Sequence, residues 1–195
     1  MNSYLEETLL PLIVSIVPKP TESYLLIASG LGDRTSQNGI LIQLGNILEI
    51  FWNKVISDYD INLIERNNKI KIGSTNRQLD HLFTLKTNPD IIYYLEAKCN
   101  LNFDTEKKPA SNDKVEAIKS VLFETYHKEV KYGYFVPCIQ DIPNQVIKSY
   151  SNIHIYGVEW MLEILEDVPF TCTEFFEFFQ NVIGPIIEEK ITYAT

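Results

Sequence analysis

The sequence predicts an α/β fold in which a mixed sheet of four or five strands is flanked by helices. Apolar residues recur every three or four positions between about residues 37 and 56, which is typical of a helix. From residue 61 to residue 98 the apolar period changes to two, which indicates strands. A second helical pattern at residues 111–128 precedes an apolar run at residues 132–139, which is typical of a buried strand.

The two ends of the chain are expected to add helices to this core. Residues 1–17 are predicted to be helical up to the break at Pro18 and Pro20. After a short strand at residues 152–157, helices are predicted at about residues 158–166 and 173–189.

The chain is expected to form one domain. It has 195 residues, and no repeat or Gly/Ser-rich linker divides it. A chain of this length can bury one sizeable hydrophobic core. We therefore predict a single domain over residues 1–195, with its core at about residues 37–139.

Composition argues against several classes of protein. The longest apolar stretches are interrupted by polar residues or proline and fall short of the ~20 residues that a membrane span needs. The first residues include two acids where a secretory signal carries basic side chains, so a cytoplasmic location is expected. The three cysteines contain no CxxC pair, which argues against a disulfide framework and a zinc knuckle.

The formal net charge of −9 weighs against a polyanionic ligand. Metal-binding carboxylates themselves add negative charge, however, and a basic cleft can lie on an acidic protein. The field that acts on a ligand is the local one.

Two predicted strands, residues 79–85 and 91–98, are joined by Lys86-Thr-Asn-Pro-Asp90 and are expected to form an antiparallel hairpin. If Leu85 pairs with Ile91, the numbers of paired residues sum to 176, and Asp80 then lies opposite Glu96. Directly opposed side chains share one face, with Cβ atoms ~5 Å apart. Two carboxylates at that distance repel unless a divalent cation lies between them.

Lys98 follows Glu96 by two positions and therefore projects from the same face of its strand. Asp80 and Glu96 are candidate ligands of Mg²⁺, with the backbone carbonyl of Ala97 as a further ligand. A lysine beside them would position a water molecule or stabilise developing charge. This set of residues suits phosphodiester hydrolysis. By alternation His81 points to the opposite face, so we interpret it as structural.

At these residues the chain resembles the PD-(D/E)XK nuclease superfamily, and within it the type II restriction endonucleases. The resemblance rests on Glu96-Ala97-Lys98 at the end of an apolar strand, on Asp80 in the preceding strand, and on the order of the surrounding elements. It covers about residues 37–139. Leu79 stands where the motif has proline. The resemblance implies a restriction-endonuclease-like core with Asp80, Glu96 and Lys98 as catalytic residues.

The resemblance also implies ligands and partners. Glu49, on the helix before the sheet, would be a further catalytic acid near the metal. The segment after Lys98 would enter a DNA cleft, which makes Lys107, Lys108 and Lys114 candidate phosphate contacts. A homodimer would cut both strands of a short double-stranded DNA site, with Mg²⁺ as cofactor and Mn²⁺ as a substitute.

Other interpretations stay open at this point. The same core serves nucleases of other defence, repair or junction-resolving systems. A DNA-binding or protein-binding relative without catalytic activity would also keep the fold. Without a ligand, Asp80, Glu96 and Lys98 would simply be charged residues of a surface hairpin, and each lysine a solvated side chain.

Overall fold

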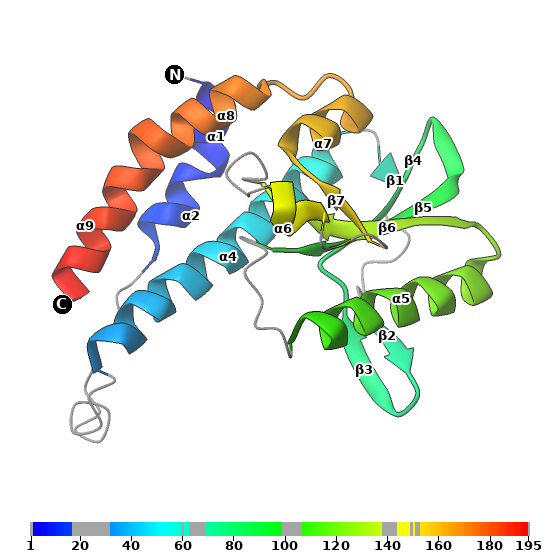
Figure 1. Ribbon diagram of the computed structural model, residues 1–195. Helices are drawn as coiled ribbons and strands as arrows, with labels where there is room; N and C mark the ends of the chain where they lie inside the picture. The colour runs from blue at the N-terminus through cyan, green and yellow to red at the C-terminus, as the bar shows by residue number, and fades with distance from the viewer. Residues whose placement is uncertain are drawn as a thin grey trace. The chain divides into compact units, whose positions relative to one another are not determined.

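The computed structural model describes residues 2–16, 32–59, 61–62, 69–98, 107–137, 144–148, 150 and 153–194. The chain divides into two compact units (Figure 1), the first formed by Met1–Trp52 with Pro169–Thr195 and the second by Asn53–Val168. Helix α4 (Gly32–Asp58) contributes residues to both units. The expected single domain over residues 1–195 stays a prediction.

The second unit is built on a mixed five-stranded sheet with the strand order β1-β4-β5-β6-β7 (Figure 1). Strands β1, β4 and β5 are antiparallel neighbours, whereas β5, β6 and β7 run parallel. The strands are β1 Ile61–Asn62, β4 His81–Leu85, β5 Asn88–Ala97, β6 Glu129–Phe135 and β7 His154–Tyr156. The α/β class and the mixed sheet are therefore confirmed.

One face of this sheet is covered by α5 (Lys107–Tyr126). Because side chains alternate along a strand, Leu82, Ile92 and Tyr94 point to the same side. They are buried in a cluster with Val115 and Ile118 of α5. The apolar residues that repeat every three or four positions in this helix thus explain both its form and its orientation.

The opposite face of the sheet packs against other elements. Phe83 and Tyr93 stack there with ring centroids 5.1 Å apart, and Tyr93 contacts Trp160 of α7 (Val158–Leu165). Short helix α6 (Asn144–Lys148) belongs to the same unit. The central strands are thus buried on both faces, as the long apolar runs in their sequence require.

The hairpin of β4 and β5 has the predicted register at one end only. His81 pairs with Leu95 and Phe83 with Tyr93, and both sums are 176. The ladder then shifts, so that Leu85 pairs with Asn88 rather than with Ile91. The predicted turn over residues 86–90 was too long, because Asn88, Pro89 and Asp90 already belong to β5.

The stretch of alternating residues from 61 to 98 contributes strands to two different sheets. Strand β2 (Lys69–Ile72) pairs only with β3 (Thr75–Gln78) in a separate two-stranded sheet. The polar sequence of β3 contains no apolar alternation, so it gave no sign of a strand.

The first unit is helical among its described residues. Its N-terminal segment forms two helices, α1 (Ser3–Thr8) and α2 (Leu10–Val14), instead of the predicted single helix over residues 1–17. Pro11 lies in the first turn of α2, where its missing N–H leaves no intrahelical bond unmade. Asn2 caps α1 by accepting hydrogen bonds from the backbone N–H groups of Tyr4 and Leu5.

The C-terminal helical segment is a single rod in the ribbon (Figure 1) but changes its hydrogen-bond pattern along its length. It consists of α8 (Cys172–Phe178), a π-helical turn (Phe179–Ile183) and α9 (Gly184–Ala194). Pro185 has no N–H to donate, which interrupts the α-helical ladder where the pattern changes. None of the helices in the described ranges is long and apolar enough to cross a bilayer.

Candidate functional site

The site is centred on Glu96 near the end of β5. By alternation its side chain lies on the α5 face with Tyr94, and it is only 4% exposed. Three side chains satisfy the buried carboxylate. The Lys98 Nζ lies 2.8 Å from Oε1, and the Lys114 Nζ lies 2.6 Å from Oε1 and 2.8 Å from Oε2. The Tyr94 hydroxyl donates to Oε2 at 3.1 Å.

Asp80 directly precedes β4 and is fixed by two backbone interactions. Its Oδ2 accepts a hydrogen bond of 2.8 Å from the Ala97 N–H, which ties it to the end of β5. Its own carbonyl oxygen accepts from the Asn53 side-chain amide at 3.0 Å. Asp80, just before the start of β4, and Glu96, near the end of β5, therefore lie close together, as the register sum of 176 predicted.

The two carboxyl groups differ in their electrostatic environment. Burial, and next the negative charge of Glu96, raise the pKa of Asp80. Burial would also raise the pKa of Glu96, but the charges and hydrogen bonds of Lys98 and Lys114 outweigh it, so that this pKa is lowered. Lys98 and Lys114 thus favour the ionised form of Glu96, whereas burial and the charge of Glu96 disfavour the ionised form of Asp80 more than these two lysines favour it.

Tyr94 completes the buried part of this cluster. Burial and the adjacent Glu96 carboxylate strongly raise the pKa of its hydroxyl, which therefore stays protonated and donates to Glu96. The ammonium groups of Lys98 and Lys114 are less enclosed, with 22% and 28% of each side chain exposed. Solvent or a ligand can reach the cluster from the lysine side.

Asn53 near the end of α4 supports the site from the opposite face of the sheet. Its side-chain oxygen lies 2.9 Å from Nδ1 of the fully buried His81, while its amide donates to the Asp80 carbonyl. The burial of His81 and its contact with Asn53 agree with the structural role predicted from its place in the strand alternation. Burial lowers the pKa of His81 to about 4, with the Glu96 charge opposing the shift.

This buried histidine predicts a loss of stability in mild acid. The pKa of His81 is about 4 in the folded state and 6.5 in the unfolded state, so below pH 6.5 the unfolded state binds more protons. Between pH 7 and pH 5 the free energy of unfolding should fall by about 2 kcal/mol from this group. Urea unfolding at the two pH values, with wild type and His81→Gln, measures the difference. An equal fall in both proteins would show that His81 is not the cause.

The structure brings Asp80, Glu96 and Lys98 together, with Ala97 between the last two. Glu49 belongs to the first unit, so its predicted role beside the metal stays a prediction. The side chains of Lys107 and Lys108 lie outside the described residues, and their predicted phosphate contacts also stay predictions.

Lys114 has a place that the sequence analysis missed. It was predicted as a phosphate contact, whereas its ammonium lies against both oxygens of Glu96. A signal was available, because Lys114, Ile118 and Leu122 are spaced by four and therefore lie on one face of the helix. A lysine in line with two core residues has to find a buried or half-buried partner.

The negative charges of Asp80 and Glu96 are already balanced by the ammonium groups of Lys98 and Lys114, so a divalent cation would have to displace one of them. In the described part of the chain, no group of three or more His, Cys, Asp and Glu side chains could hold a metal ion. The candidate donors are therefore the two carboxylates and a backbone carbonyl. The raised pKa of Asp80 marks a carboxylate that a nearby cation would stabilise. Binding at Glu96 would require at least one ammonium to leave its oxygen, because Lys98 and Lys114 both contact it.

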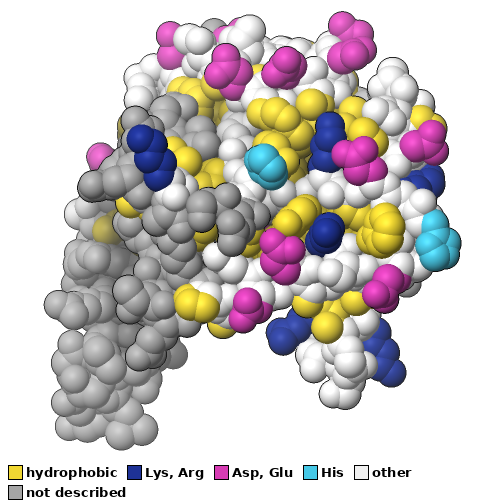
Figure 2. Space-filling model, turned by 45° about the vertical axis from the view of Figure 1, so that its right-hand side comes forward, with side chains coloured by type: hydrophobic (Ala, Val, Ile, Leu, Met, Phe, Trp, Pro, Cys, Tyr) yellow, Lys and Arg dark blue, Asp and Glu magenta, His cyan; other side chains and the backbone are white. Residues whose placement is uncertain are grey.

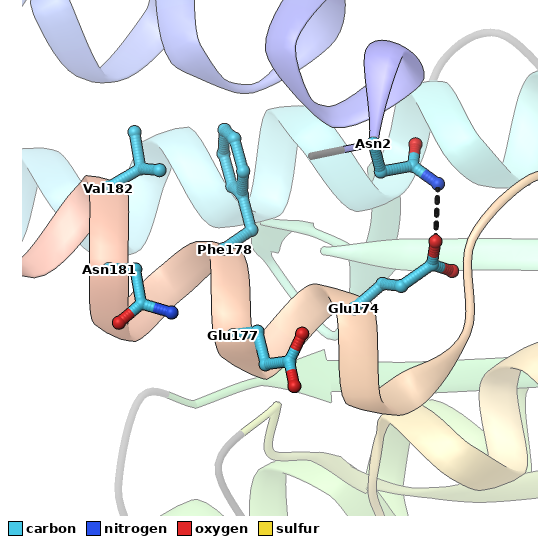
Figure 3. Close-up of a pocket in the computed structure, with 6 residues that line it drawn as sticks. All are labelled: Asn2, Glu174, Glu177, Phe178, Asn181 and Val182. Atoms are coloured by element: carbon cyan, nitrogen blue, oxygen red, sulfur yellow. Dashed lines mark hydrogen bonds between the residues drawn. The ribbon is translucent and has the colours of Figure 1, made fainter.

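A cavity of about 360 Å³ lies in the first unit (Figure 3). It is lined by Asn2 at the start of α1 and by residues of the C-terminal helical segment, among them Glu174 and Glu177. Glu174 is engaged by the Asn2 amide at 3.3 Å and by Thr171 in a capping box. Glu174 therefore serves to cap α8 and to link it to α1. The residues that line the cavity are different from those of the Glu96 cluster.

The sequence was also compared with known proteins. No protein-family model matches it, and no curated protein matches it either.

Proposed function

We propose that the chain is a Mg²⁺-dependent nuclease of the PD-(D/E)XK type that hydrolyses phosphodiester bonds of double-stranded DNA. The finer proposal is a type II restriction endonuclease with a restriction-endonuclease-like core, acting as a homodimer in the cytoplasm. The observation that carries the proposal is the convergence of Asp80, Glu96 and Lys98 at the ends of two adjacent strands, next to a second lysine.

The arrangement has a chemical logic that a structural ion pair lacks. A stabilising surface pair needs one carboxylate and one ammonium, and here an additional aspartate is held against Glu96 with a raised pKa. Carboxyl groups whose pKa is shifted by burial and by a charged neighbour occur often at functional sites. Asp80, Glu96 and the carbonyl of Ala97 would hold the cation. A bound Mg²⁺ would supply Lewis-acid polarisation of the phosphoryl group.

The side chains and backbone groups around the site would position the ligands and stabilise charge on the substrate. Ala97 N–H orients the Asp80 carboxylate, and Tyr94 holds one Glu96 oxygen in place. If Glu96 served as a metal ligand instead of as their counter-charge, Lys98 and Lys114 would be available to the substrate. Lys98 would orient the attacking water or stabilise the charge that develops on the phosphate, and Lys114 would contact the phosphate.

A second candidate is a relative that binds DNA or protein without cleaving it. Its support is that both carboxylate oxygens of Glu96 already have hydrogen-bond partners. Two ammonium groups and a hydroxyl around one carboxylate form a stable arrangement in the absence of a ligand. The net charge of −9 also favours a protein partner. Neither observation explains why Asp80 is held beside Glu96.

The test is cleavage of unmethylated phage and plasmid DNA by purified protein, with Mg²⁺ or with EDTA. Wild type should cut in Mg²⁺ and not in EDTA, with Mn²⁺ able to replace Mg²⁺. Lys98→Ala should lower the rate by about 10²-fold to 10³-fold, because it removes a charged donor from the transition state. Lys131→Ala serves as a matched control, since Lys131 is exposed and pairs with Tyr93, three positions before Glu96.

The pattern of products separates the proposals. Discrete fragments would support a site-specific enzyme, and sequencing of their ends would give the site. Smearing or nicking with the same dependence on Mg²⁺ and Lys98 would favour a less specific nuclease of a defence, repair or junction-resolving system. If duplex, branched and single-stranded DNA all stay intact, the nuclease proposal is wrong.

A further inference from the structure

The hairpin of β2 and β3 is a polar projection of the second unit with a well-defined register. Lys69 pairs with Gln78 and Lys71 with Asn76, so these four side chains share one face. The turn is closed by Gly73 and the residue that follows it. Gly73 has a φ of +58°, in the left-handed region that glycine adopts freely.

The other face of the hairpin anchors it to the body of the unit. Ile70 and Ile72 alternate with the lysines and pack against the buried cluster that contains Leu79 and Val115. The hairpin thus has the hydrophobic support that an isolated two-stranded ribbon needs. It is joined directly to the site, since Asp80 follows Gln78 by two positions, a span of ~7 Å in extended chain.

The outer face differs in charge from the protein as a whole. Lys69, Lys71, Asn76 and Gln78 are all exposed on this face, and Arg77, which pairs with Ile70 on the other face, is exposed as well. Residues 69–78 contain these three basic side chains and no acid, although the chain carries 26 acidic and 17 basic residues. Figure 2 shows the hairpin as a projection with Lys and Arg side chains on its two flanks.

We propose that this outer face, which we call the ribbon face (Lys69, Lys71, Asn76 and Gln78), enters the major groove of duplex DNA. This inference rests on the proposed nuclease function. The major groove of B-DNA is wide enough to admit an α-helix or a two-stranded β-ribbon. Lys69 and Lys71 contact the phosphates that border the groove, while the Asn76 and Gln78 amides can each bind an adenine edge through two hydrogen bonds.

The composition of the hairpin favours a duplex over a single strand. Proteins that bind single-stranded nucleic acid commonly stack bases on aromatic side chains. Residues 69–78 contain no Phe, Tyr or Trp. The short span between Gln78 and Asp80 would let one duplex contact the ribbon face and the Glu96 cluster at the same time.

The experiment measures DNA binding separately from cleavage. A fluorescein-labelled pool of random duplexes is titrated in EDTA, and the affinity is followed from about 50 to 200 mM salt. Lys69→Gln/Lys71→Gln should weaken binding on the order of tenfold, and the slope of log affinity against log salt should fall in magnitude by about two. Asn76→Ala/Gln78→Ala should keep that slope and change which sequences wild type enriches from the pool.

A matched control removes the same charge elsewhere in the unit. Lys86→Gln/Lys131→Gln replaces two exposed lysines outside the hairpin, one after the end of β4 and one in β6 opposite Tyr93, and it should leave the affinity and the salt slope at wild-type values. Circular dichroism of all variants checks the fold, which the exposed substitutions should not change.

The outcomes distinguish this inference from the nuclease proposal. If the ribbon-face lysine variant binds like wild type and like the control, or if wild type binds no duplex at all, the ribbon face is not a DNA contact. An equal loss of affinity for single-stranded DNA or RNA would overturn the assignment to duplex DNA. If the lysine variant loses duplex binding while wild type never cleaves in Mg²⁺, the ribbon face stands and the nuclease proposal falls.

Discussion

Asp80→Asn should abolish Mg²⁺-dependent cleavage of DNA, with a loss on the order of 10³-fold, and should not weaken the fold. The activity falls because an amide is a poor ligand for a hard divalent cation. The fold is preserved because the Asn side-chain oxygen can still accept the hydrogen bond from Ala97 N–H. Cleavage is measured under the conditions used for wild type, and stability is measured by thermal unfolding in EDTA.

The direction of the stability change follows from the pKa of Asp80. Burial and Glu96 raise this pKa above its unfolded value, so the folded state holds the proton more tightly than the unfolded state does. Stability from this group is therefore present at low pH and is lost as the pH rises through the folded pKa. The ionised form of Asp80 therefore destabilises the fold in the absence of a cation, and Asp80→Asn should unfold at the wild-type temperature or above it.

Glu96→Gln provides the contrasting control. It should lose cleavage to a similar degree, but it should also destabilise the fold by about 1 to 3 kcal/mol, because Lys98 and Lys114 lose their counter-charge. The lowered pKa of Glu96 also indicates that its ionised form stabilises the fold. This stabilisation is present above the pKa of the unfolded state and is lost as the pH falls through the pKa of the folded state. If Asp80→Asn and Glu96→Gln destabilise the fold equally, the proposed difference between the two carboxylates is wrong.

The part of the site that the sequence could predict is the part set by strand alternation. The positions of Glu96, Lys98 and Tyr94 on one face follow from a period of two. The opposition of Asp80 and Glu96 followed from one assumed residue pair, Leu85 with Ile91. That pair does not form, but the ladder shifts only beyond Phe83, so the sum of 176 still holds next to Asp80.

The contacts that the sequence could not predict depend on packing between elements. The Asn53 amide bridges the Asp80 backbone and His81 across 27 and 28 residues, and no local pattern encodes such a distance. The position of Lys114 over Glu96 depends on how α5 lies on the sheet. The separate sheet of β2 and β3 was missed for a different reason, since the exposed ribbon face removes the apolar alternation on which strand prediction relies.

Gly133→Ala should cause the largest loss of stability of any change proposed for this chain, about 3 kcal/mol. Gly133 lies in β6 opposite His154 of β7. A Cβ at this position would overlap the backbone carbonyl oxygen of His154 and would lie 2.8 Å from Cε2 of Tyr156. A backbone oxygen held in a parallel ladder cannot rotate away as the end of a side chain can, so β7 would have to shift.

Gly39→Ala is the matched control, because it adds the same methyl group to helix α4 at a point where, beyond its chain neighbours and the helix's own backbone, no atom of the described residues lies within 4 Å. It should stabilise the fold by about 0.5 to 1 kcal/mol, since alanine loses less conformational freedom than glycine in a helix. Urea unfolding followed by circular dichroism measures both variants. A Gly133→Ala protein as stable as wild type would contradict the close pairing of β6 with β7.

The consequence of this substitution should reach the candidate site. Tyr134 and Phe135 follow Gly133 in β6 and pair with Glu96 and Ala97, and the Lys98 N–H donates to the Phe135 carbonyl at 2.9 Å. A shift of β6 would therefore move the backbone that positions the carboxylate and its lysine. Under conditions in which Gly133→Ala is still folded, Mg²⁺-dependent cleavage should fall more than in Gly39→Ala, because catalysis depends on sub-ångström placement of these groups.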